Sequence, residues 1–204
     1  MGLTSEQVHW IGGAAFAFVA VALLGHLIAP ERLPWAPALL PALLIGYGLE
    51  SFLDPFIHGG AAPANYGAET TQHLVQGTAA FAAGVIEWAR LRGALTGADW
   101  GMATPVALLV IAIVFLVHAQ HDATVSPMVL MVQHRALAIT LAVAATARAA
   151  TLLAPGVTVL QGAWLLPLFV FGLLMLAYTE RDRGMGGHTA PTVIGADTLH
   201  AERR

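Results

Sequence analysis

The sequence predicts an all-α protein: a polytopic bundle of about six helices that crosses a membrane. Of its 204 residues, 57% are hydrophobic and only 10% are charged, whereas a soluble domain carries about 25% charged residues. The mean hydropathy of +0.72 agrees. A bilayer core of about 30 Å needs about 20 apolar residues per helix, so the chain length fits six spans with short loops. We expect residues 1–180 to form this single bundle and residues 184–204 to be a disordered tail.

Three predicted spans lie in the first half of the chain, and turn-forming or charged residues end each of them. The first covers about residues 8–28. It is longer than the core of a signal peptide, so we expect a retained span. The second covers about residues 35–57 and is ended by His58-Gly59-Gly60. The third covers about residues 68–91 and is followed by a polar connection.

The second half supplies three further spans, at about residues 102–120, 126–153 and 157–178. The fifth is longer than a bilayer requires, which predicts a tilt or a protruding end. Pro155-Gly156 separates it from the sixth. Gly and Ala are frequent inside the spans, and such small residues allow helices to pack closely where lipid removes the hydrophobic incentive.

Composition also limits the chemistry that the chain can perform. The net charge is −3, so the sequence offers no basic surface for nucleic acid. Cysteine is absent, which excludes disulfides and thiolate metal sites. Any bound metal would therefore have nitrogen and oxygen ligands. We expect the chain to be integral to a cell membrane, with the lipid bilayer as its main partner, and a homo-oligomer or a membrane partner stays open.

Most of the histidines are predicted to gather at one membrane face. With an even number of spans, the N-terminus, the loops after the second and fourth spans and the C-terminal tail share one side. Ionisable residues inside spans usually face the bundle interior and have partners or a function. The residues that this tracing places toward one face come from five different spans: His9, His58, His73, His118, His121 and His134.

Helical spacing indicates a transition-metal site at that face. Glu69 and His73 are at i and i+4, and His118 and His121 are at i and i+3, spacings that place side chains on one helix face. Such Glu and His pairs hold metals inside helix bundles. We predict copper, iron or zinc, with His73, His118, His121 and His134 as the first candidate ligands and Glu50, His58 and His9 as the next. Carboxylates expected to orient these imidazoles are Asp54, Glu69 and Asp122.

Four other interpretations of these residues stay open. A redox site would make the chain a metal-dependent membrane oxidoreductase. Histidines facing one another across the bundle could ligate haem, as in a b-type cytochrome. Glu50, Asp54 and His58 could relay protons in an ion-conducting protein without metal. The histidines could also be merely interfacial, in a scaffold protein. Met128 and Met131 near His134 are candidate soft ligands for Cu(I), although Met in an apolar span is usually packing.

A smaller polar group is predicted at the opposite face: His26, Glu87, Arg148 and Gln161. An Arg inside a membrane needs a counter-charge, and we predict a structural pair of Glu87 with Arg148.

Several short strings resemble the ordered motifs of the eukaryotic transmembrane protein 45 family. They are Thr71-Gln72-His73, the stretch from Phe115 to Asp122, Val132-Gln133-His134 and Leu160-Gln161-Gly162-Ala163-Trp164, and the similarity covers about residues 8–170. The family has a His-x-His pair after the fourth span, a second His pair and a seventh span with a further His. Here the first pair is His118-x-x-His121, the second is reduced to His134, and that last span is missing. The resemblance implies the fold and a role for the histidines, but no reaction.

Overall fold

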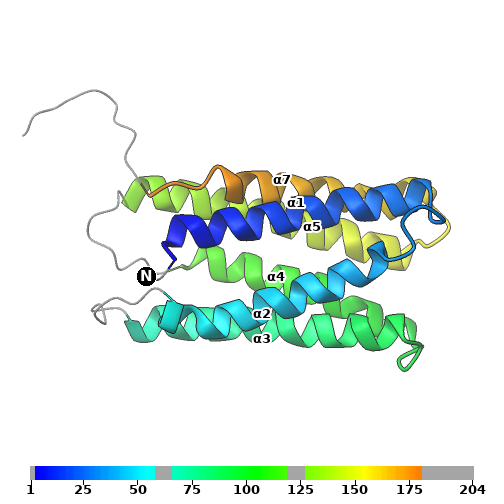
Figure 1. Ribbon diagram of the computed structural model, residues 1–204, viewed down its shortest axis with the longest axis horizontal. Coiled ribbons are helices and arrows are strands. Elements are labelled where there is room, and N and C mark those ends of the chain that lie inside the picture. Colours follow the sequence, from blue (N-terminus) through cyan, green and yellow to red (C-terminus); the bar gives the residue numbers. More distant parts are fainter. Residues whose placement is uncertain (1–2, 58–65, 119–126, 181–204) are drawn as a thin grey trace, which may run out of the picture.

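The computed structural model describes residues 3–57, 66–118 and 127–180, and the regular structure in these ranges is entirely helical (Figure 1). The elements are α1 Ser5–Ile28, η1 Ala36–Ala38, α2 Leu39–Ile57, α3 Tyr66–Leu91, η2 Ala98–Met102, α4 Ala103–Leu116, α5 Pro127–Leu153, α6 Thr158–Ala163 and α7 Leu165–Leu176, where η marks a 3-10 helix. The predicted all-α bundle is confirmed. The predicted tail at residues 184–204 lies outside the described residues.

Five stretches of the described chain are long and apolar enough to cross a bilayer: 5–28, 36–53, 98–116, 127–153 and 159–176. The chain is therefore a multi-pass membrane protein. The third predicted span, α3, is the exception, because polar residues such as Glu69, Gln76 and Glu87 interrupt its apolar sequence. It nevertheless packs between α2 and α4 along the bundle (Figure 1).

The sixth predicted span is divided into two helices. α6 ends at Ala163, α7 begins at Leu165, and Trp164 lies between them in a turn. Pro167 explains the break, because its ring has no N–H to donate to the carbonyl of Ala163 and clashes with that carbonyl in a continuous helix. α4 also ends earlier than the prediction of residue 120, at Leu116.

The helices do not pack simply in the order of the sequence. α1 lies against α7, α2 against α3, and α4 between α3 and α5, while α1 and α2 make little contact with each other. The fully buried side chains at the centre include Leu44, Leu108, Leu137, Leu168 and Phe171. The first and last helices therefore close the bundle around a leucine-rich core.

Glycines set the closest helix contacts, as the small-residue pattern predicts. A Cβ added to Gly13 of α1 would lie 2.6 Å from the carbonyl oxygen of Gly172 in α7. A Cβ added to Gly48 of α2 would lie 2.7 Å from the Cβ of Phe81 and 2.8 Å from the carbonyl oxygen of Gly77, both in α3. Any larger residue at these positions would push the paired helices apart.

The up-and-down course of the chain gives the bundle two distinct ends (Figure 1). We call the end where α1, α3 and α5 begin the histidine end, because His9, His73 and His134 lie in the first turns of those helices. The opposite end, where the same three helices finish, we call the arginine end, after Arg90 and Arg148.

Candidate metal centre

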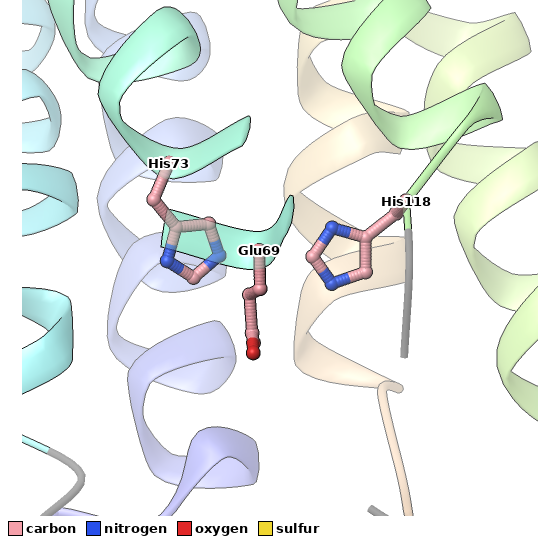
Figure 2. Close-up of side chains that lie close together, drawn as sticks. All are labelled: Glu69, His73 and His118. Carbon is pink, nitrogen blue, oxygen red and sulfur yellow. The ribbon is translucent and has the colours of Figure 1, made fainter. Parts of the chain in front are cut away.

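Three side chains at the histidine end converge on one point. Glu69, His73 and His118 each offer one ligand atom, and these atoms all lie within 4.8 Å of one another. All three residues are half-buried. Figure 2 shows the two imidazoles on either side of the Glu69 side chain, with His73 and Glu69 coming from α3 and His118 from the end of α4. A carboxylate and two imidazoles in this arrangement are a donor set suited to a divalent transition metal.

The local sequence explains why these groups meet. Glu69 and His73 are one helical turn apart in α3, so they share the face that α3 turns toward α4. α4 ends at Leu116, which leaves His118 just beyond the helix. Gln72 donates a hydrogen bond from Nε2 to the backbone carbonyl of Val117, at 2.7 Å. This bond fixes the residue before His118 against the first turns of α3.

A row of aromatic rings continues from this group across the bundle end. The ring of His118 stacks on His73 with centroids 5.8 Å apart, and on His134 of α5 with centroids 4.7 Å apart. His134 lies 6.3 Å from His9 of α1, and His9 stacks on Tyr178 at 3.8 Å. The predicted convergence of imidazoles from separate helices is therefore present for four of them.

Backbone carbonyls fix the tautomers of His134 and His9. His134 donates from Nδ1 to the carbonyl of Leu130 at 2.9 Å, and His9 donates from Nδ1 to the carbonyl of Ser5 at 2.8 Å. Because a carbonyl only accepts, the ring proton of the neutral imidazole is on Nδ1 and the lone pair is on Nε2. Each ring is thereby held in the form that can bind a metal through Nε2.

The segment after α7 closes the histidine end. Gln133 of α5 accepts from the backbone N–H of Thr179 at 2.9 Å and donates to its carbonyl at 2.8 Å. Glu6 of α1 accepts from the Thr179 hydroxyl and from the backbone N–H of Glu180. Trp10 donates to the carbonyl of Tyr178 at 2.9 Å. These bonds place Tyr178, which the sequence did not single out, beside His9.

The structure distributes the predicted site residues unevenly. It brings together His73 and His118, places His134 and His9 in the adjoining row, and leaves Glu50 half-buried in α2, outside the group of three. His58 and His121 lie outside the described residues, as does the side chain of Asp54.

The carboxylate of Glu69 belongs to the same group of possible ligand atoms as the two imidazoles. The sequence predicted it as a carboxylate that orients an imidazole, and its position fits that role as well as the role of a ligand. The signal in the sequence was the i, i+4 relation to His73. That signal does not distinguish a ligand from a carboxylate that orients one.

The predicted pair of Glu87 with Arg148 at the arginine end is not a direct ion pair among the described residues, although the charge of Glu87 attracts the Arg148 guanidinium. Glu87 Oε2 accepts from Arg90 at 2.7 Å, and Oε1 accepts from the Thr104 hydroxyl at 2.6 Å. Arg90 is one helical turn from Glu87, which makes it the closer partner. The guanidinium of Arg148 lies instead over the ring of Trp164, 4.9 Å from its centroid.

Comparison of the chain with family models, with curated proteins and with solved structures finds no match. The resemblance to the transmembrane protein 45 family therefore stays a prediction. The geometry of the chain itself must carry any functional conclusion.

Proposed function

We propose that this membrane protein binds one divalent transition metal, zinc or iron, through Glu69, His73 and His118. The observation that carries the proposal is the convergence of their three ligand atoms within 4.8 Å at the histidine end. Membership of the transmembrane protein 45 family is part of the same hypothesis, and it adds nothing about the reaction.

The donor set favours zinc or iron(II) over copper(I). Two imidazoles and one carboxylate are the protein ligands of many catalytic zinc sites, which keep a position for water, and of non-haem iron(II) sites with open positions. Copper(I) prefers soft ligands, and the two methionines proposed for it are turned outward, with Met128 70% exposed and Met131 43% exposed. An open position would allow the metal to activate water or bind a substrate.

The three side chains need only a small adjustment to bind a metal. Metal–ligand bonds of about 2.0–2.2 Å in a tetrahedral site bring neighbouring ligand atoms to about 3.3 Å. The atoms here lie within 4.8 Å, so a closure of at most about 1.5 Å completes the site. Side-chain rotation supplies such a movement without a shift of the helices. The two segments that carry the ligands are already held together, because Gln72 of α3 bonds to the backbone at the end of α4.

His134 supports this site from one side. Its ring stacks on that of His118 with an angle of 18° between the planes, so the two rings present their faces to each other. Axial haem ligands instead direct nitrogen lone pairs at one iron from opposite sides. This geometry argues against His118 and His134 as the two axial ligands of a haem.

Elemental analysis of the full chain, purified in a mild detergent from medium supplied with zinc, iron and copper, tests the proposal. We expect about one zinc or iron per chain in the wild type and almost none in the His73→Ala/His118→Ala variant, which loses two of three ligands. His26→Ala, which removes a half-buried imidazole at the arginine end, is the matched control and should keep the metal.

Graded variants separate ligands from supporting residues. Titration with zinc should show a 10- to 100-fold weaker affinity for His134→Ala and for Gln72→Leu, the range typical of outer-shell changes, and a larger loss for His118→Ala. Equal metal content in the wild type and the double variant would overturn the proposal. A Soret absorption band lost in His118→Ala would replace it with the haem alternative, and proton flux into liposomes without bound metal would replace it with the ion-conducting one.

A further inference from the structure

The arginine end holds a cavity that the proposed metal site does not use. Its volume is about 330 Å³, in the range of pockets that hold small ligands. Six helices and η1 contribute to its lining: α1, α2, α3, α5, α6 and α7. The cavity therefore lies where these helices meet at the arginine end, and it is partly open to the surroundings.

The charges that line the cavity do not balance. Arg90, Arg148 and Glu87 all face it, which gives two cations and one anion. Both oxygens of Glu87 are already engaged, one by Arg90 and the other by Thr104. Among the described residues, no carboxylate lies within ion-pair distance of Arg148, and its buried Nε has no hydrogen-bond partner. The described lining of the cavity therefore carries one more positive than negative charge, because Arg148 and Arg90 share Glu87 as their nearby carboxylate.

An uncompensated guanidinium inside a membrane bundle is costly. The ring of Trp164, which is buried, offers Arg148 a cation–π contact at 4.9 Å. That contact covers one face of the guanidinium and accepts none of its N–H groups. The in-plane donors, which form the fork that recognises carboxylates and phosphates, are left for a ligand.

Apart from His26 and Gln161, the rest of the cavity lining is apolar. Leucines from four elements line it, among them Leu23 of α1, Leu40 of α2, Leu91 of α3 and Leu165 of α7. Three exposed tryptophans mark the same end of the bundle: Trp35, Trp88 and Trp100. Exposed tryptophans of a membrane protein gather at the headgroup level. The cavity therefore lies at a depth that amphiphiles of the bilayer can reach.

We propose that this cavity is a binding site for an oxyanion, a carboxylate or a phosphate, with Arg148 as its counter-charge. Arg148 forms a forked, charge-assisted contact with the oxyanion, and Arg90 contributes a further positive charge. The leucine walls hold the apolar part of the ligand when the oxyanion is the head of a fatty acid or a phospholipid.

Thermal unfolding and native mass spectrometry of the full chain in a neutral detergent test this inference. The probes are oleate, phosphatidylglycerol and inorganic phosphate, with oleyl alcohol as the uncharged match of oleate. At 100 times its Kd, a ligand of the folded state stabilises it by about 2.7 kcal/mol, which the melting temperature reports. We expect at least one oxyanion probe to raise the melting temperature of the wild type, and oleyl alcohol to leave it unchanged.

The three probes also identify the source of the oxyanion. A rise in melting temperature with oleate or phosphatidylglycerol alone assigns the site to a bilayer amphiphile. An equally large rise with inorganic phosphate assigns it to an anion from water. Arg148→Met should weaken binding of the active probe by about 10- to 100-fold, the value of a hydrogen bond to a charged group. The matched control is Arg135→Met, which removes an exposed arginine near the histidine end of the same helix and should bind like the wild type.

Two further variants guard against a folding failure of Arg148→Met. Arg148→Lys keeps the charge and should retain part of the affinity, whereas Leu23→Trp fills the cavity without changing any charge and should block binding. The inference is overturned if no oxyanion probe shifts the wild type, if Arg148→Met binds the active probe as well as the wild type does, or if oleyl alcohol stabilises as much as oleate.

Discussion

The two ends of the bundle collect polar side chains in similar numbers but of different chemistry. At the histidine end, imidazoles stack as closely as 4.7 Å, with one carboxylate among them. At the arginine end, fixed charges face a cavity, and a buried carboxylate is held by two donors. Charges inside a membrane protein need partners. The first end therefore offers electron-pair donors that suit a cation, and the second offers positive charges that suit an anion.

The two glutamates of α3 express this difference most directly. Glu87 is 8% exposed and both of its oxygens accept strong hydrogen bonds, so its role is to hold the helices together. Glu69 is half-buried, and its oxygen lies beside two imidazole nitrogens. Both residues belong to the same helix, which makes them a matched pair for testing whether the two ends really differ.

Replacement of these glutamates by glutamine should have the largest and most divergent effects. Glu87→Gln leaves Arg90 without its ion-pair partner, and breaking a buried pair costs about 3 kcal/mol or more. Glu69→Gln should change the stability of the metal-free protein by less than about 1 kcal/mol. Chemical denaturation of the metal-free proteins in detergent measures the free energy of unfolding of both variants.

Metal content gives the opposite ranking for the same two variants. Glu69→Gln should lose the metal, because it removes a ligand oxygen, whereas the folded fraction of Glu87→Gln should keep it. If both variants lose stability equally, or if Glu69→Gln retains the metal, the assignment of a binding role to one end and a structural role to the other fails.

Glycine substitutions in the middle of the bundle, where the helices pack closely, should have effects of intermediate size. Gly48→Ala places a methyl group 2.7 Å from the Cβ of Phe81, an overpacking that costs about 1–3 kcal/mol. Gly46→Ala, two residues earlier in α2, meets nothing within 4 Å and should stabilise the helix by about 0.5–1 kcal/mol. Thermal melting should therefore shift in opposite directions for the two variants, with the metal content unchanged in both. A lower melting temperature for Gly46→Ala as well would show that the contact of Gly48 with Phe81 does not explain the destabilisation of Gly48→Ala.

The smallest effect is expected for the methionines near the histidine end. Met128→Leu and Met131→Leu change exposed side chains, so the free energy of unfolding should stay within about 0.5 kcal/mol of the wild type. Metal content should also be unchanged, since neither side chain belongs to the group of ligand atoms. A loss of bound copper in either variant would instead support a soft copper(I) site.

The sequence predicted much of the histidine end because its geometry follows from helix periodicity. The relation of Glu69 to His73 is set inside one helix, and the parity of the spans places His9, His118 and His134 at the same end. It did not predict the order of the rings or the place of Tyr178, because these depend on which helices are neighbours. α1 packs against α7 rather than α2, and no local pattern in the sequence encodes that choice.

At the arginine end the sequence was less informative. It identified Glu87 and Arg148 as charges that need partners, but it did not identify Arg90 as the direct partner of Glu87. A guanidinium one helical turn away competes with one on another helix, and the outcome depends on side-chain directions that only packing fixes. The cavity was not predictable, because its lining comes from helices that are far apart in the sequence.

By itself, the sequence determined that this chain is a helical membrane protein with imidazoles at one end, because apolar length and helical period are local properties of the chain. Only the tertiary structure decided which three side chains share a metal-sized space and which arginine remains without a carboxylate in the described structure. Both depend on contacts between residues far apart in sequence, such as Glu69 with His118 and Arg148 with Trp164.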